Sequence, residues 1–373
     1  MRIAIPKEIK VHEYRVGLTP AGVRELLGHG HQVKVEHNCG SAIGFSDADY
    51  QQAGASVEAD AEVLFEWGEL IVKVKEPQAQ EYQRLKPEHC LFTYLHLAPD
   101  PDQTRGLMSS QCTAIAYETV TDSHGRLPLL APMSEVAGRM SVQAGAHCLE
   151  ISQGGSGTLL GGVPGVAPGK VAVLGGGVVG INAARMAMGL GADVTVVDRS
   201  IDRLKELDSI YGPQLKTCYA TNETVEELVC NADLVIGAVL VPGAEAPKLV
   251  TRHMLKKMRN GSVVVDVSVD QGGCFETTRA TTHADPTYVE EGVIHYCVAN
   301  MPGALARTAT LALTNATLPY VLAIADQGAD TALRSDAGLR SGLNIYRGKV
   351  THAAVAAALG YDYESAEKVL GIV

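Results

Sequence analysis

Short apolar runs alternate with amphipathic stretches along the first third of the chain. Five of these runs span residues 2–5, 32–36, 70–74, 90–95 and 113–118, and several of the five are rich in β-branched residues. Helical periodicity lies between some of them, as at residues 20–27, where Thr19 can cap the helix and Pro20 suits its first turn. Strands that alternate with helices predict a parallel sheet covered on both faces.

A second series of the same kind follows a long helix, expected at residues 132–153 and opened by Ser134. The series begins after the glycine-rich stretch 154–169. Its apolar runs span residues 171–174, 193–197, 234–238, 262–267 and 293–297. We therefore expect an α/β protein with two Rossmann-like domains built on parallel sheets.

The rest of the chain indicates how the two domains are divided. An apolar helix is expected at residues 305–325, and the tail 339–373 has alanine-rich helical character with no strand series of its own. We expect this tail to pack onto the N-terminal domain and complete it. Residues 1–130 and 306–373 would then form one discontinuous domain, and residues 131–305 the other.

A glycine motif at the start of the second series indicates a dinucleotide site. Gly175, Gly177 and Gly180 form a G-x-G-x-x-G between the run 171–174 and a small-residue helix expected at 182–190. The first glycine permits a tight turn, the second lets the backbone approach a pyrophosphate, and the third allows helix and strand to pack closely. The phosphate would lie at the positive end of the helix.

Asp198 strengthens this interpretation, because it ends the next apolar run about 20 residues further on. There its carboxylate can hold the ribose hydroxyls and would repel a 2′-phosphate, which favours NAD over NADP. Arg199 is the main reservation, since an arginine in that region can accept the extra phosphate. The alternative is a glycine-rich turn with a chance aspartate, but the full context favours an NAD-binding domain at residues 131–305.

The composition narrows the range of partners and compartments. The formal net charge is −11, so no basic surface is expected that would attract nucleic acid or an anionic membrane. The eight cysteines form no C-x-x-C pair, and the first residues lack the apolar stretch of an export signal. We expect a cytoplasmic protein with reduced thiols. The segment 306–325 is apolar, but its threonines, Asn315 and Pro319 favour a buried or interdomain helix over a membrane span.

Hydride transfer to or from an amino acid requires cations for its carboxylate and a group that moves protons. Arg15 lies in the loop before the first helix, and loops often carry function. Lys75 and His96 end their strands, at the edge where open α/β sheets bind ligands. Lys73 should share the face of Lys75, so only the position of Lys75 nearer this edge favours it. Solvated charges and a structural histidine remain the alternatives.

Asp270 follows a very apolar strand and could take part in proton transfer, although a turn-forming aspartate is the alternative. Asp266 competes with it, but a mid-strand position favours a paired structural carboxylate. Ser134 could contact a cofactor phosphate as well as cap its helix. No metal-binding motif is present, so no metal is expected. The pattern G-x-S-x-G of acyl transferases fails at Thr158, where glycine is required.

Six stretches together resemble the alanine dehydrogenase family, and the likeness runs almost end to end. They lie at residues 15–20, 72–77, 93–98, 175–180, 237–243 and 270–275. The resemblance implies NAD-dependent oxidative deamination of L-alanine to pyruvate and ammonium, the reverse reductive amination, alanine catabolism and a homohexamer. It also implies that Arg15 and Lys75 bind the substrate in the domain formed by 1–130 and 306–373, and that His96 and Asp270 handle proton transfers.

The same resemblance implies a set of cofactor contacts. Besides the three glycines, these are Ser134, Val178, Val179, Asp198, Arg203, Ala220, Val239, Leu240, Val267, Ser268, Val269, Asp270, Val298, Ala299, Asn300 and Met301. Ala220 departs from the family, which often has a serine near the adenosine, and this puts one side-chain hydrogen bond in doubt.

Three other functions compete with this one. A transhydrogenase-type subunit, which passes hydride between two nucleotides, resembles the chain more loosely, and the Lys75 and His96 motifs count against it. A 2-hydroxyacid dehydrogenase would need a similar carboxylate clamp and proton relay. A non-catalytic NAD-binding protein would be favoured by the loss of Lys75, His96 or Asp270, and all three are present.

Overall fold

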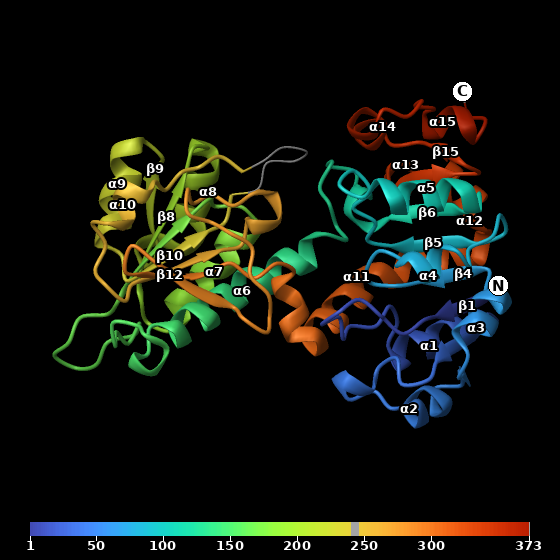
Figure 1. The fold of residues 1–373 in the computed structure, drawn as a ribbon, viewed down its shortest axis with the longest axis horizontal. Helices are drawn as coiled ribbons and strands as arrows, with labels where there is room; N and C mark the ends of the chain where they lie inside the picture. Colours follow the sequence, from blue (N-terminus) through green and yellow to red (C-terminus); the bar gives the residue numbers. More distant parts are fainter. Residues whose placement is uncertain (240–245, 373) are drawn as a thin grey trace. The chain divides into compact units, whose positions relative to one another are not determined.

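The computed structural model describes residues 1–239 and 246–372 of the chain (Figure 1). By its contacts the chain divides into two compact units, one formed by Met1–Met133 with Leu305–Val373 and the other by Ser134–Ala304. Each unit contains one sheet, and most neighbouring strands in both sheets are parallel. The expected fold class, α/β with two Rossmann-like sheets, is confirmed.

The first unit is built on an eight-stranded sheet in the order β15-β14-β6-β5-β4-β1-β2-β3. Its strands are β1 (Arg2–Ile5), β2 (Gln32–Glu36), β3 (Ser56–Glu58), β4 (Leu70–Val72), β5 (Cys90–Thr93), β6 (Thr113–Ala116), β14 (Leu343–Tyr346) and β15 (Lys349–Val350). Strands β1 to β6 are parallel to one another where they pair. The strand order reverses between β1 and β4, which makes that point the topological switch of the sheet.

The first unit also contains the helices that precede and follow these strands along the chain. They are α1 (Pro20–Gly28), α2 (Asp47–Gln52), α3 (Ala61–Trp67), α4 (Ala79–Tyr82), α5 (Pro101–Ser110), α11 (Ala306–Gln327), α12 (Ala329–Ser335), α13 (Ala337–Ser341), α14 (Ala353–Leu359) and α15 (Ala366–Val369). Thr19 caps α1 as expected, because its hydroxyl accepts the backbone N–H of Gly22 at 3.2 Å. Short 3-10 turns lie at Ser41–Ile43 and Tyr117–Thr119.

The tail of the chain differs from the expectation that it has no strands. Strand β14 pairs antiparallel with β6, through Leu343 opposite Ile115, and β15 then pairs with β14. Leu343 and Ile345 are buried. A four-residue segment this short is a strand because the open edge of β6 supplies its hydrogen-bond partners, and that edge lies more than two hundred residues away in the sequence.

The second unit has a seven-stranded sheet in the order β12-β13-β11-β10-β7-β8-β9. Its strands are β7 (Lys170–Leu174), β8 (Asp193–Asp198), β9 (Lys216–Tyr219), β10 (Leu234–Gly237), β11 (Val263–Asp266), β12 (Thr287–Glu290) and β13 (Val293–Tyr296). All described pairs are parallel except β12 with β13. The helices are α6 (Ala131–Cys148), α7 (Val178–Gly189), α8 (Ile201–Tyr211), α9 (Asn222–Asn231) and α10 (Arg252–Leu255), with 3-10 turns at Ile151–Gln153, Gly212–Gln214, Val269–Gln271 and Met301–Leu305.

Helix α6 begins earlier than predicted, so the expectation that Ser134 opens it is wrong. Its first turn is hydrogen-bonded from Ala131 to the Leu127 carbonyl at 3.0 Å, and from Met133 to that of Leu130 at 3.1 Å. Pro132 falls within this first turn, where its missing N–H costs nothing. Ser134 is therefore the fourth helical residue. The helix also ends at Cys148, before the expected residue 153.

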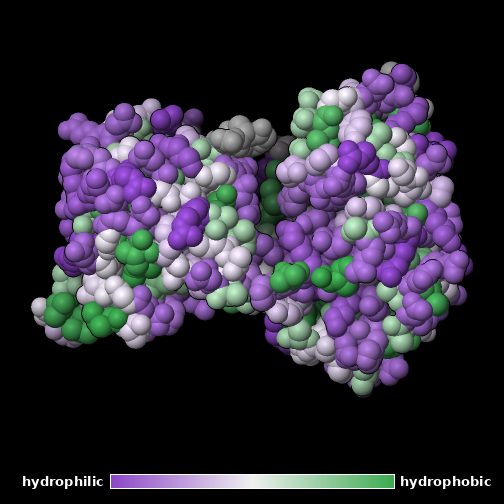
Figure 2. Space-filling model, viewed as in Figure 1, coloured by the Kyte–Doolittle hydropathy of each residue, from purple (hydrophilic) through white to green (hydrophobic). Residues whose placement is uncertain are grey.

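The glycine-rich stretch after α6 exposes large apolar side chains. Leu159 is 65% exposed, Val163 53% and Val166 63%, and Ile151 just before them is 73% exposed. Figure 2 shows hydrophobic surface gathered over this loop, at the lower left of the view. We call these four residues the apolar loop. Contiguous exposed apolar surface of this kind marks an interaction site more often than scattered single residues do.

Helix α11 and the turn before it, residues 301–327, are long and apolar enough to cross a membrane by length and composition. One such helix is weak evidence, since the core helix of a globular unit meets the same criteria. In α11 the residues Ala309, Leu313, Val321 and Ile324 are buried within the first unit, as expected for a core helix.

Candidate active site

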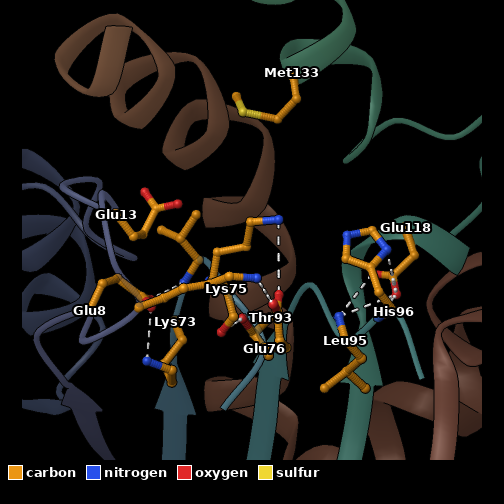
Figure 3. A network of polar contacts seen from close by, with 12 residues as sticks. Glu8, Glu13, Lys73, Lys75, Glu76, Thr93, Leu95, His96, Glu118 and Met133 are labelled. Carbon is orange, nitrogen blue, oxygen red and sulfur yellow. Dashed lines mark hydrogen bonds and ion pairs between the residues drawn. The ribbon is translucent and has the colours of Figure 1, made fainter. Parts of the chain in front are cut away.

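The candidate functional residues of the first unit lie around its topological switch point, where β1 and β4 are neighbours. Ligands of open α/β sheets bind outside the carboxyl ends of the strands at such a point. The segment after β1 carries Arg15, and the segment after β4 carries Lys75. His96 follows β5, the next strand of the sheet. Figure 3 shows Lys75 and His96 above the ends of their strands.

Arg15 is only 2% exposed, and its charge is balanced by Glu13. The Glu13 carboxylate accepts from Nε at 2.7 Å, from Nη2 at 2.5 Å and from the Arg15 backbone N–H at 3.1 Å. Burial lowers the pKa of Arg15, but Glu13 outweighs burial and raises the pKa above its ordinary value. Nη1 donates to the Met133 sulfur at 3.1 Å. Arg15 is therefore a fixed, cationic side chain and not a solvated surface arginine.

The structure separates the two lysines, of which the sequence favoured Lys75 only by its position nearer the ligand edge. The Lys73 ammonium is fully buried between two carboxylates, Glu8 at 3.0 Å and Glu81 at 2.7 Å, whose side chains are 2% and 3% exposed. Burial lowers the pKa of Lys73, but these carboxylates outweigh burial and raise the pKa above its ordinary value. Lys73 thus holds two carboxylates in place inside the fold and is inaccessible to a substrate.

Lys75 has a weaker set of partners. Its ammonium is 3.9 Å from the Glu76 carboxylate, and its side chain is 13% exposed. Its backbone is held by Glu8, which accepts its N–H at 3.3 Å, and by Thr93, whose hydroxyl donates to its carbonyl at 3.0 Å. Burial lowers the pKa of Lys75, Glu76 opposes this, and the positive charge of Arg15 lowers it further. Arg15 and Lys75 are thus close enough for their charges to interact, and two cations at a sheet edge can attract an anion.

His96 lies just beyond β5, which ends two residues earlier than predicted, and its side chain is 45% exposed. The imidazole stacks on the Tyr94 ring, with the centroids 5.9 Å apart and the planes within 5°. Tyr94 is itself fixed, because its hydroxyl donates to the Leu129 carbonyl at 2.6 Å. An accessible, supported imidazole at a ligand edge suits proton transfer.

In the second unit, the glycine motif forms the turn from β7 into α7, as expected. Gly175 has φ +103°, a conformation that L residues rarely adopt. A Cβ at Gly180 would lie 1.8 Å from the Gly175 carbonyl oxygen, so only glycine fits there. At Gly177 a Cβ would meet nothing within 4 Å, and no side chain caps the helix that begins at Val178. The turn therefore has the space and the helix N-terminus that a pyrophosphate requires.

Asp198 ends β8 beside this turn. Its carboxylate accepts the backbone N–H of Gly176 at 2.7 Å and that of Ser200 at 2.8 Å. Arg203 donates from Nε to the Gly176 carbonyl at 2.6 Å, and the Ala220 N–H donates to the Asp198 carbonyl at 3.0 Å. The structure thus brings the expected residues 198, 203 and 220 together around the glycine turn.

Asp266 and Asp270, the two carboxylates that the sequence set against each other, have different surroundings. Asp266 is fully buried and accepts the Ser268 N–H at 3.0 Å and the Cys274 N–H at 2.9 Å, and burial raises the pKa of its carboxyl. Asp270 is exposed, in the turn Val269–Gln271 after β11. Asp266 is therefore the paired structural carboxylate, and it shapes the turn that carries Asp270.

The remaining expected cofactor residues are placed at the same edge of this sheet or on α6. The Ser268 hydroxyl donates to the Val239 carbonyl at 2.7 Å, which ties the turn 267–270 after β11 to the end of β10. Residues 298–301 follow β13, and Asn300 there has φ +56°. Val178 and Val179 begin α7, whereas Ser134 lies on α6 one turn before Gly138, which packs on the Val179 carbonyl. Leu240 lies outside the described residues.

The sequence matches the family Alanine dehydrogenase/PNT in two parts, its N-terminal domain at residues 4–137 and its C-terminal domain at residues 141–353. The chain belongs to the alanine dehydrogenase/PNT family. It is 62% identical to the alanine dehydrogenase of Halomonas elongata over 371 residues, which cover 100% of both chains. It is 55% identical to that of Bacillus subtilis over 372 residues, or 99% of this chain and 98% of the relative.

Solved structures of the same family have the same fold. A structure titled L-alanine dehydrogenase matches with a TM-score of 0.94 and 52% identity, covering 96% of this chain and 99% of the other. A transhydrogenase from Sinorhizobium meliloti matches with a TM-score of 0.81 and 26% identity, covering 95% and 100%. The family and the Rossmann-like sheet together indicate a nicotinamide cofactor.

The sequence did not single out the carboxylates that surround the expected site in this member of the alanine dehydrogenase/PNT family. These are Glu8, Glu13, Glu76 and Glu118. Glu118 follows β6 directly, so the strand-edge argument that selected Lys75 and His96 would also have selected it. Among the described residues no group of three or more histidine, cysteine, aspartate or glutamate side chains could hold a metal ion.

Proposed function

We propose that this chain catalyses the NAD-dependent oxidative deamination of L-alanine to pyruvate and ammonium, and the reverse reductive amination, in alanine catabolism. The observation that carries the proposal is the pair of cations at one sheet edge, Arg15 and Lys75, in a chain 62% identical from end to end to an alanine dehydrogenase. Such a pair suits a small zwitterionic or anionic substrate.

The Arg15 guanidinium would bind the substrate carboxylate. Its Nε and Nη2 are occupied by Glu13, which fixes the plane of the group, whereas Nη1 donates to the thioether of Met133. A thioether is a weak acceptor, and a carboxylate oxygen would be a stronger partner for this N–H. The charge-assisted bond that forms is about twice as strong as a neutral one.

Lys75 would hold the group at the substrate Cα. In pyruvate this is a carbonyl oxygen, which an ammonium can polarise. In alanine it is an amino group, and the lowered pKa of Lys75 makes the ammonium a better proton donor and its neutral form more accessible than in an ordinary lysine. The hydrogen bonds of the Lys75 backbone with Glu8 and Thr93 would keep this segment after β4 fixed while the ammonium binds the substrate.

NAD fits the second unit, since the open space at Gly177 admits a pyrophosphate and the Asp198 carboxylate has acceptor capacity beyond its two backbone contacts. NAD held there would supply the acceptor for the hydride of the substrate Cα. The imine left on the substrate must take up water, and His96 and Asp270 would receive and return the protons of that step. Both side chains are accessible, which such a role requires.

The test is NADH formation followed by absorbance. L-alanine with NAD should give turnover, and L-lactate or NADP should give much less. Pyruvate and ammonium should each appear in a one-to-one ratio with NADH. Turnover with lactate and not with alanine would contradict the proposal and favour a 2-hydroxyacid dehydrogenase.

We also propose a cytoplasmic homohexamer. All eight cysteines are free, which suits a reducing compartment. The apolar loop supports self-association, because Leu159 and Val166 are exposed and unlike an ordinary solvated surface. Light scattering on Leu159→Asp/Val166→Asp should report smaller assemblies than the wild type, whereas Val289→Asp, at a side chain 64% exposed on β12, is the matched control. An unchanged assembly in the loop variant would contradict this role.

A further inference from the structure

The backbone of His96 has a conformation that needs an explanation. Its φ is +48°, in the left-handed region that residues other than glycine seldom adopt. Such a conformation costs free energy and persists where surrounding contacts enforce it, often at functional sites. β5 ends at Thr93, so the strand ladder does not enforce it.

One carboxylate accounts for this conformation. Glu118 accepts the backbone N–H of His96 at 2.6 Å and that of Leu95 at 3.2 Å from each of its two oxygens. Glu118 belongs to the 3-10 turn Tyr117–Thr119, directly after β6, which is the neighbour of β5. Figure 3 shows its carboxylate below the His96 ring, joined to Leu95 and His96. A charged acceptor that binds two successive N–H groups fixes the turn that aims the next side chain.

The same carboxylate also faces the imidazole. His96 Nδ1 lies 3.8 Å from Glu118 Oε1, and the Glu118 side chain is 14% exposed. This distance is too long for a hydrogen bond, so the carboxylate acts on the ring through its charge. The charge favours a proton on Nδ1, the nearer nitrogen, and leaves Nε2 as the nitrogen that exchanges protons. The ring is supported on one face by Tyr94. Two further titratable groups of the described residues feel the Glu118 charge. Burial lowers the pKa of His352, and the Glu118 charge opposes this in part. Burial raises the pKa of Tyr94, Arg15 opposes this, and the Glu118 charge adds to the rise.

We propose that Glu118 is a positioning residue for the reaction: it holds the left-handed turn at His96 and orients the imidazole through Nδ1. The inference rests on the proposed function, since it assumes that His96 moves protons. Nothing in the strand geometry alone would place the ring, because β5 and its ladder end before it. Glu118 supplies both the backbone anchor and the charge that the ring faces.

A double-mutant cycle tests this directly. Steady-state rates with L-alanine and NAD are measured for wild type, Glu118→Gln, His96→Ala and the double variant. Glutamine keeps one oxygen acceptor but removes the charge. The matched control is Glu69→Gln, because the Glu69 carboxylate also accepts a strand N–H, that of Arg2 at 2.7 Å, but at the opposite edge of the same sheet.

We expect Glu118→Gln to lower kcat by about 10–100-fold, the usual effect of removing a group that orients a working side chain, with KM for alanine changed by less than about threefold. In the His96→Ala background the same substitution should change kcat by no more than about twofold. A kcat loss of equal size in both backgrounds would show that Glu118 acts without His96, and a wild-type kcat in Glu118→Gln would also overturn the inference. Glu69→Gln should keep the wild-type rates.

Hydrogen exchange gives a readout that does not depend on activity. The amides of residues 95 and 96 should exchange faster in Glu118→Gln than in the wild type, and unchanged exchange would overturn the backbone role. Failure of the proposed function looks different. A wild-type kcat in His96→Ala would refute the role of His96 itself, whereas an impaired His96→Ala beside an unimpaired Glu118→Gln would refute only the role of Glu118.

Discussion

Lys73 and Lys75, the two lysines that follow β4, should respond differently to replacement by methionine. The first replacement should lower stability, and the second should lower activity. In the wild type the Glu8 and Glu81 carboxylates lie 3.0 and 2.7 Å from the Lys73 ammonium. Lys73→Met removes this cation and leaves both carboxylates buried. Methionine is close to lysine in length and leaves no large cavity, so the effect is electrostatic. Lys75→Met removes a side chain whose ionic contact, with Glu76, is 3.9 Å long and partly exposed.

The magnitudes follow from burial. Removing one partner of a buried ion pair costs about 3–5 kcal/mol, because a charge remains in the interior. For a domain of about 200 residues this corresponds to a fall of roughly 6–20 °C in Tm. Burial already raises the pKa of Glu8, so one carboxylate can take up a proton in the variant, which keeps the loss near the lower end. Lys75→Met should cost about 1 kcal/mol or less.

The assay combines thermal denaturation with steady-state kinetics at pH 7.5. Lys73→Met should lower Tm strongly, and Lys75→Met should retain a near wild-type Tm but lose most of its kcat/KM for alanine and for pyruvate. The reasoning would be refuted if Lys73→Met melted at the wild-type temperature. It would equally be refuted if Lys75→Met kept the wild-type kcat/KM.

Three further predictions follow from the second unit. Gly177→Ala should keep the wild-type Tm, because its Cβ would meet no atom within 4 Å. It should weaken NADH binding about tenfold or more, as measured by NADH fluorescence, because the added methyl group would fill the space proposed for the pyrophosphate. Unchanged affinity would contradict a pyrophosphate site at Gly177. Asp198→Ser should lower the kcat/KM preference for NAD over NADP by about tenfold, and an unchanged ratio in initial rates would count against its role. Burial lowers the pKa of His295 in the folded state. Below about pH 6.5 the unfolded state therefore binds more protons than the folded state, and the free energy of unfolding should fall as the pH drops. The fall should be at most about 1.4 kcal/mol per pH unit. In urea titrations His295→Gln should show a shallower dependence between pH 7 and 5, and an equal slope would contradict this.

The local pattern predicted the central strands and the helices α1 and α11 well, because these elements carry their own signal. Buried parallel strands such as β7 and β11 are continuous apolar runs, and the turn after β7 requires glycine at residues 175 and 180 whatever surrounds it. The strands missed were β3, β9, β12, β14 and β15, which are short and lie toward the sheet edges. Segments of that kind become strands through the neighbour they pair with, and that neighbour is distant in the sequence.

The residues of the candidate site divide in the same way, into those with a local sequence signal and those defined by partners distant in the sequence. The strand-edge rule selected His96 and favoured Lys75 over Lys73 by position alone. It could not show that Lys73 is buried between Glu8 and Glu81, because these carboxylates come from other parts of the chain. Partners brought in by tertiary structure leave no periodic signal. Ser134 illustrates the converse case, since a good N-cap residue was overridden by a helix that starts three residues earlier.

The most direct measurement follows the hydrogen at the substrate Cα. L-[2-²H]alanine is incubated with NAD and the enzyme, and the label is located by mass spectrometry and NMR. The account predicts that deuterium is transferred to the nicotinamide C4, that pyruvate and ammonium form in equal amounts, and that Arg15→Met and Lys75→Met lose this transfer while still binding NADH. Deuterium released to water, or full transfer without either cation, would contradict it.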